Sequence, residues 1–175
     1  MVLPMMTRRL LSALVVLFAL ATGQAQDSAQ STNPIQLRTE IYIVSLVTLA
    51  DGTQEERFTP ATEAIPGQVI EYRVFATNVG ETTLPAGRVT ILGPVMDGFE
   101  FVPRSATPSS ERVLTEFSAD GETFGTAPLL VGEGEARRVV EPVDYQAVRW
   151  TLLVPLEPGQ EEPFYYRVTV QEDEG

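Results

Sequence analysis

A turn followed by an alternating strand occurs twice in this chain, with nearly the same residues. Pro66-Gly67-Gln68 precedes a run that contains Tyr72-Arg73-Val74, and Pro158-Gly159-Gln160 precedes a run that contains Tyr166-Arg167-Val168. Pro and Gly supply the backbone conformations that tight turns need. Alternation of apolar and polar residues places the apolar ones on one face of a strand. The two phrases therefore predict a module built from strands and tight turns.

Other runs of alternating or β-branched residues predict further short strands. With the two above, the expected strands lie at residues 37–49, 54–58, 69–77, 89–95, 99–102, 112–117, 145–156 and 164–170. The run 37–49 has apolar residues on both faces, so we expect it to be buried on two sides. Gly93-Pro94 is expected to break the strand at 89–95. The stretch 124–143 is expected to be a long, mobile, partly acidic loop.

No helical periodicity appears outside an apolar N-terminal run. The sequence therefore predicts an all-β fold, an immunoglobulin-like antiparallel β-sandwich of about seven to nine strands over residues 35–171. We expect Tyr72, Trp150, Phe164 and Tyr166 to point inward and fill much of the core. Each large apolar side chain contributes about 1.5–3 kcal/mol when it is buried, so these rings support a core without disulfides.

The N-terminus has the organisation of an export signal. Arg8-Arg9 precedes the apolar run 10–21, and the small residues Gly23 and Ala25 precede a cleavage site. The run is shorter than the roughly 20 apolar residues that cross a bilayer. We therefore expect a cleaved signal peptide over residues 1–25 and no integral membrane span in the mature protein.

Three segments follow the predicted signal. Residues 26–34 are polar and predict a flexible leader, residues 35–171 form the predicted sandwich, and residues 172–175 form an acidic tail. The expected location is extracytoplasmic, meaning periplasmic, cell-surface associated or secreted. Ten of the 12 basic residues, all of them Arg, remain after cleavage against 24 acidic residues, which takes the formal charge from −12 to −14. This charge argues against nucleic acid and anionic lipid surfaces as partners and favours cations or basic proteins.

The sequence contains no Cys, no His and no Lys. It therefore has no thiol nucleophile, no imidazole base or ligand, and no amine for Schiff-base chemistry. We expect no enzyme activity and no cofactor, and we assign no catalytic, cofactor-binding or metal-binding residues.

Acidic residues offer the remaining candidate chemistry. Calcium requires six to eight convergent oxygen ligands, whereas turn formation alone explains Asp-Gly pairs. We favour turns, with calcium as the alternative, at Asp51-Gly52, Asp97-Gly98 and Asp120-Gly121. Glycosidase chemistry requires two carboxyl groups that face each other across a cleft. We favour solvated surface charge for the pairs Glu55-Glu56, Glu133/Glu135 and Glu161-Glu162.

Two further polar features have a structural interpretation. Arg137-Arg138 is expected to neutralise Glu133, Glu135 and Glu141. Asn78 precedes a turn, where Asn commonly satisfies backbone groups.

Four stretches, in the same order along the chain, resemble the bacterial conserved repeat domain of unknown function. They are the Pro-Gly turn, Tyr-centred strand and Asn-x-Gly at 66–80, the Phe-x-Phe-Val-Pro-x-Ser-Ala-Thr phrase at 99–107, the Asp-Gly segment at 117–125, and the Trp strand, Pro-Gly turn and final strand at 149–170. The resemblance covers residues 63–171 and departs from the family at 92–97, where an Asp-x-Leu-Pro phrase is usual. It implies an immunoglobulin-like, secreted or cell-surface module and carries over no catalytic residue.

The sequence thus favours an exported, non-catalytic structural or adhesive module that makes protein–protein contacts in the bacterial cell envelope. An exposed sheet edge is the expected docking site, and the region 112–144 is a second candidate surface. The expected partners are envelope or surface proteins. The alternatives are a calcium-stabilised surface module and, ranked below it, an enzyme that acts on cell-wall polymer. Partner identity, strand order and oligomeric state stay open at this point.

Overall fold

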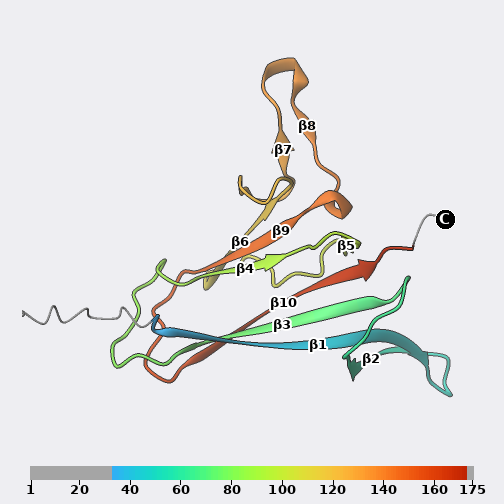
Figure 1. Ribbon diagram of the computed structural model, residues 1–175, viewed down its shortest axis with the longest axis horizontal. Coiled ribbons are helices and arrows are strands. Elements are labelled where there is room, and N and C mark those ends of the chain that lie inside the picture. The colour runs from blue at the N-terminus through green and yellow to red at the C-terminus, as the bar shows by residue number, and fades with distance from the viewer. Residues whose placement is uncertain (1–32, 173–175) are drawn as a thin grey trace, which may run out of the picture. The chain divides into compact units, whose positions relative to one another are not determined.

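The computed structural model describes residues 33–172, the side chain of Glu135 aside (Figure 1). The predicted signal peptide at 1–25 lies outside the described residues, as do most of the predicted leader at 26–34 and most of the predicted acidic tail at 172–175. Within the described part the chain forms strands and two short 3-10 helices, and it forms no α-helix.

Ten strands are present between residues 33 and 172. They are β1 (Ile35–Thr48), β2 (Gln54–Pro60), β3 (Val69–Asn78), β4 (Thr90–Pro94), β5 (Phe99–Phe101), β6 (Val113–Ser118), β7 (Leu130–Val131), β8 (Arg138–Val139), β9 (Ala147–Leu152) and β10 (Glu161–Val170). The 3-10 helices are η1 (Gly134–Ala136) and η2 (Pro142–Asp144). The number exceeds the expected seven to nine because β7 and β8, of two residues each, were not anticipated.

The strands form two stacked sheets and a hairpin, and every pairing is antiparallel. The larger sheet has the order β2-β1-β3-β10-β5, the smaller has the order β4-β9-β6, and β7 pairs with β8 in a hairpin that stands away from both (Figure 1). The all-β antiparallel sandwich is confirmed. Here β10 lies inside the larger sheet, whereas the last strand of an antibody constant domain lies in the smaller, three-stranded sheet.

The core forms where β9 packs on β10. Trp150 is fully buried and its ring lies 5.4 Å from that of Phe164 and 5.9 Å from that of Tyr166, measured between centroids. Its indole N–H donates to the carbonyl oxygen of Thr107 at 3.3 Å, which satisfies the one polar atom of the ring. Tyr72 stacks on Tyr166 at 5.1 Å but is only partly buried. The expected core role is confirmed in full for three of the four rings.

The prediction that residues 37–49 are buried on both faces is wrong. None of the residues of β1 is buried, and several of its large apolar side chains are exposed. The reason is the unequal size of the sheets, since three strands cannot cover five. The smaller sheet covers β3, β10 and β5, and leaves β1 and β2 outside the sandwich.

The prediction of an irregular loop over 124–143 is wrong for its central part. Leu130 pairs with Val139 and Val131 with Arg138 to form the β7–β8 hairpin. Buried Leu129 anchors its base, where its carbonyl oxygen accepts a hydrogen bond from the N–H of Val140 at 2.9 Å. Two residues per strand are too few for alternation to be recognised in the sequence.

Candidate functional site

One apolar strip of the larger sheet lies open next to the core. It consists of Leu37, Thr39 and Ile41 on β1, which we call the β1 strip. Directly paired residues of an antiparallel sheet share a face, and these three pair with Ala76, Val74 and Tyr72 of β3. The β1 strip therefore lies on the face of the sheet that carries the core, yet Leu37 is 55% exposed and Ile41 is 39% exposed.

The strand β4 provides a free backbone edge above this face. The N–H of Leu152 donates to the oxygen of Val89 at 2.9 Å, and the N–H of Val95 donates to the oxygen of Gln146 at 2.8 Å. Backbone groups alternate in direction along a strand, so those of Thr90 and Leu92 point away from β9. No hydrogen bond from another residue of the described range reaches these groups, and the side chain of Leu92 is 53% exposed.

The prediction that Gly93-Pro94 breaks this strand is wrong, because β4 continues through both residues. A Cβ atom at Gly93 would lie 2.8 Å from Cε1 of Tyr166 and 3.0 Å from Cη2 of Trp150, so only glycine lets the strand approach the core this closely. Pro94 is tolerated because its missing N–H would point to the free edge. Its carbonyl oxygen accepts a hydrogen bond from the hydroxyl of Tyr166 at 2.8 Å.

The order of contacts between the sheets places the free edge of β4 on the side of β1. The strand β9 lies on β10 through Trp150, and β6 lies on β5 through Phe117, whose ring centroid is 5.6 Å from that of Phe101. The remaining strand of the smaller sheet, β4, is therefore the one toward β3 and β1. A strand added to β4 would extend the smaller sheet over the β1 strip.

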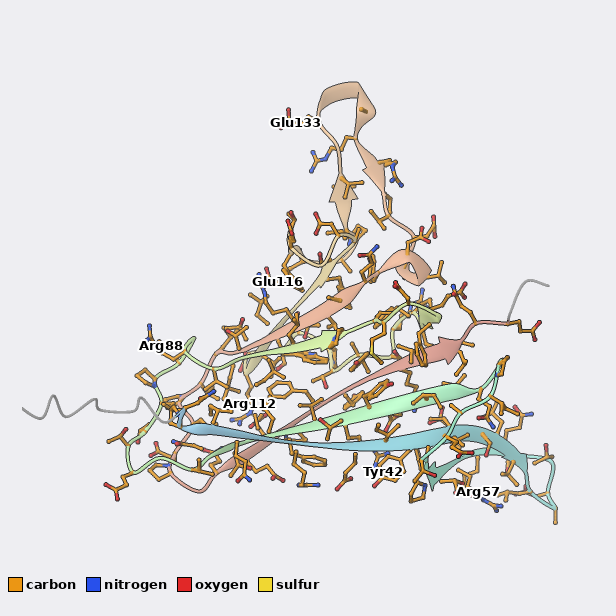
Figure 2. All side chains as sticks on the ribbon, viewed as in Figure 1. Tyr42, Arg57, Arg88, Arg112, Glu116 and Glu133 are labelled. Carbon is orange, nitrogen blue, oxygen red and sulfur yellow. The ribbon has the colours of Figure 1, made fainter. Side chains whose placement is uncertain are left out.

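Charged and aromatic side chains that contact one another cover the opposite face of the larger sheet. The carboxylate of buried Glu71 accepts hydrogen bonds from Arg73 at 2.6 Å and from Arg167 at 2.7 Å. Both terminal nitrogens of Arg167 donate to Glu56 at 2.7 Å, which raises the pKa of Arg167 and holds the pKa of Glu56 below its usual value. The guanidinium of Arg73 also lies 4.6 Å from the ring centre of Tyr42, which is labelled on this face in Figure 2.

The Asp-Gly pairs act as turns. The Oδ1 atom of Asp51 accepts hydrogen bonds from the N–H and hydroxyl of Thr53 at 3.0 and 2.7 Å. The Oδ1 atom of Asp120 accepts from the N–H groups of Thr123 and Glu122 at 2.7 and 2.8 Å, and these bonds lower the pKa of Asp120. At Asp97-Gly98 the glycine has φ +83°, and the N–H of Phe99 donates to the carbonyl oxygen of Met96 at 3.1 Å. No three acidic side chains among residues 33–172 come close enough together to hold a metal ion.

The carboxylates of Glu56, Glu161 and Glu162 are each held by a different arginine. Glu161 contacts Arg38 and Thr77, whereas Glu162 contacts Arg112 at 2.9 Å, because adjacent residues of a strand point to opposite faces. In the first pair, Glu56 is held by Arg167. Figure 2 shows Glu133 at the tip of the β7–β8 hairpin. The carboxylates of Glu56, Glu161 and Glu162 therefore act as ion-pair partners, whereas glycoside hydrolysis needs two carboxyl groups that face each other across a cleft.

The remaining polar candidates have the following positions. Asn78 is fully buried; its amide donates to the carbonyl oxygens of Thr82 and Leu156, both at 2.9 Å, and its Oδ1 accepts from the N–H of Gly80 at 3.0 Å. It therefore serves as an internal brace, as its sequence context predicted. Arg137 and Arg138 are exposed on the hairpin and form no ion pair with the acidic residues whose side chains are described.

Sequence reasoning did not find the β1 strip, because nothing in the local pattern of 37–49 signals that a covering strand is absent.

None of the helices described is long and apolar enough to cross a membrane. No protein family, curated protein or solved structure matches this chain.

Proposed function

We propose that this chain is an exported, non-catalytic module of the bacterial cell envelope that binds another protein by accepting one extended strand. The strand pairs with the free edge of β4 and lies over the β1 strip. The observation that carries the proposal is the exposure of Leu37 and Ile41 on the same face as the buried residues of β3. Exposed apolar surface beside an unpaired edge is typical of partners that bind by strand addition.

The site sets the chemistry of the partner strand. Side chains that point inward must be apolar, because they would pack on Leu37 and Ile41. The partner's backbone would pair with the N–H and carbonyl groups of Thr90 and Leu92. Basic residues on either side of the partner strand fit the acidic composition of this chain, with 24 acidic against 12 basic residues.

The export and envelope parts of the proposal rest on the predicted signal peptide and on the resemblance to the conserved repeat domain. The non-catalytic part rests on the lack of Cys, His and Lys in the sequence. The carboxylates of Asp51 and Asp120 accept hydrogen bonds from their own turns. No observation therefore favours the calcium alternative, and we put forward no second function.

The test compares envelope proteins captured by the immobilised mature chain and by variants of the site. Leu37→Asp places a charge in the β1 strip. Leu92→Pro removes one N–H from the free edge of β4 without removing a hydrogen bond to β9. We expect one basic, strand-forming partner to be lost from both variants, and a synthetic peptide of its extended segment to bind the wild-type chain.

Matched controls separate the site from general effects of substitution. Leu92→Ala keeps the N–H and should retain the partner. Leu130→Asp adds the same charge at an exposed position of β7 and should also retain it. Capture of the same proteins by the wild-type chain, Leu37→Asp and Leu92→Pro would show that the proposed strand site is not used.

A further inference from the structure

A second surface lies at the opposite edge of the sandwich, beyond β5 and β6. It is a cleft of about 800 Å³ between these strands, the segment that follows β5 and the base of the β7–β8 hairpin. Its floor is an aromatic cluster of Phe101, Phe117 and Tyr145, whose ring centroids lie 4.8 to 5.7 Å apart. Pro108, Pro128, Val139, Val140 and Pro142 supply much of the remaining wall. The size and the apolar lining are those of a site for a small hydrophobic molecule.

Most hydroxyl groups at this cleft are engaged by the chain itself. The hydroxyl of Thr115 donates to the carbonyl oxygen of Thr107 at 2.8 Å. The hydroxyl oxygen of Thr107 accepts from the N–H of Tyr165 at 2.9 Å, and that of Ser109 accepts from the N–H of Thr115 at 2.9 Å. A peptide backbone buried here would find few partners, and an unpaired buried polar group is costly. The lining therefore favours hydrocarbon over peptide.

Arg104 is the one charged residue in the lining of the cleft. Its side chain is exposed, and it forms no ion pair with any acidic side chain described in residues 33–172. In a protein with twice as many acidic as basic residues, an unpaired guanidinium beside an apolar cleft favours the binding of an anion there.

The backbone holds Arg104 at this position in a left-handed conformation that residues other than glycine rarely adopt. Val102 and Thr107 both donate backbone hydrogen bonds to β10, and residues 103–106 between them bulge out of the strand edge. The N–H of Ser105 donates to the oxygen of Val102 at 3.3 Å, which closes a turn with Pro103 and Arg104 at its centre. Arg104 has φ 62°, the only positive φ outside glycine in the described residues. Gly or Asn is the usual residue at such a position, and strained residues of this kind cluster at ligand sites.

We propose that this cleft binds a long-chain monocarboxylate, that is, a molecule of the fatty-acid class. The hydrocarbon chain packs on Phe101, Phe117 and Tyr145, and the carboxylate pairs with the guanidinium of Arg104. This site is separate from the strand site at β1 and β4, so either one can fail without affecting the other.

The test is a fluorescence titration of the mature chain with a dansyl-labelled undecanoate, followed by displacement. We expect one saturable site from which decanoate, but not decanol, displaces the probe. Arg104→Gly should weaken binding at least tenfold, because a hydrogen bond between charged groups is lost. This variant should fold well, since glycine suits the positive φ of the position. Arg88→Gly is the matched control, in the exposed turn before β4 (Figure 2), and should bind like the wild type.

A second pair of variants locates the hydrocarbon chain. Val139→Glu puts a carboxylate on the cleft wall at a position that is 51% exposed, and Val143→Glu puts one at a position that is 44% exposed and outside the cleft lining. We expect weaker binding only for the first. The proposal is overturned if the folded wild-type chain shows no saturable binding, if Arg104→Gly binds as tightly as the wild type, if decanol displaces the probe as well as decanoate does, or if the two Val variants bind alike.

Discussion

The hydrogen bonds of the buried Asn78 side chain allow a specific prediction about stability. Asn78→Ala removes three hydrogen bonds, to Thr82, Leu156 and Gly80. Each contributes about 0.5–1.5 kcal/mol net. The oxygen of Leu156 keeps a second donor, the N–H of Leu84 at 3.0 Å, and Thr82 and Gly80 are not buried, so water can reach them. We therefore expect Asn78→Ala to lower the free energy of unfolding by about 2–3 kcal/mol, a large share of the 5–15 kcal/mol typical of a domain.

Asn78→Asp separates hydrogen bonding from shape in this prediction. Aspartate has nearly the size of asparagine, but its carboxylate would face the carbonyl oxygens of Thr82 and Leu156 instead of donating to them. Because a buried charge without a partner is costly, we expect Asn78→Asp to be less stable at pH 7 than Asn78→Ala.

The measurement is unfolding in guanidinium chloride, followed by the fluorescence of Trp150, which is the only tryptophan and is fully buried. Thr62→Ala, at an exposed position between β2 and β3, serves as the control and should stay within about 0.5 kcal/mol of the wild type. If Asn78→Asp were as stable as the wild type and Asn78→Ala were not, cavity volume and not hydrogen bonding would explain the role of Asn78.

Three further predictions concern single positions. Gly93→Ala should destabilise the fold by about 1–3 kcal/mol, because its Cβ would lie 2.8 Å from the ring of Tyr166; an unchanged denaturation midpoint would contradict this packing argument. Arg104→Gly should raise the free energy of unfolding by about 0.5–1 kcal/mol, since relief of an αL conformation outweighs the added backbone entropy, and a lower melting temperature would count against the strain. Asp120→Ala should lower the melting temperature at pH 7, because the folded pKa of Asp120 is depressed by hydrogen bonds from its own turn. A carboxyl group with a depressed pKa stabilises the fold at pH values above its unfolded pKa of about 4, and this stabilisation is lost as the pH falls below that value. The difference in melting temperature between Asp120→Ala and the wild type should therefore shrink below about pH 4. A difference that does not change with pH would argue against this linkage.

Several features of the fold were readable from local sequence because they depend only on neighbouring residues. The alternation around Trp150 and in Phe164–Val168 identifies the inward face wherever the strand pairs. Asp51 and Asp120 form their turns with residues two and three positions away. Asn78 combines a bond two residues away with one to Leu156, and the turn context alone was enough to suggest a structural role.

The candidate sites depend on contacts between distant parts of the chain and could not be read in this way. Arg104 looks like an ordinary surface residue until the pairing of residues 102 and 107 with β10 shows that it sits on a bulge at positive φ. The cleft beside it is completed by the base of the β7–β8 hairpin, whose strands are too short to leave a pattern.

The sequence by itself determined that this chain forms antiparallel strands, which face is apolar in the strands that alternate, and which residues make the turns, because these follow from alternation and from the backbone preferences of Gly, Pro and Asp. Only the tertiary structure decided that five strands face three. Apolar residues such as Leu37 and Ile41 mark a face that is able to be buried, but whether another strand covers that face depends on how many strands the opposing sheet recruits from elsewhere in the chain.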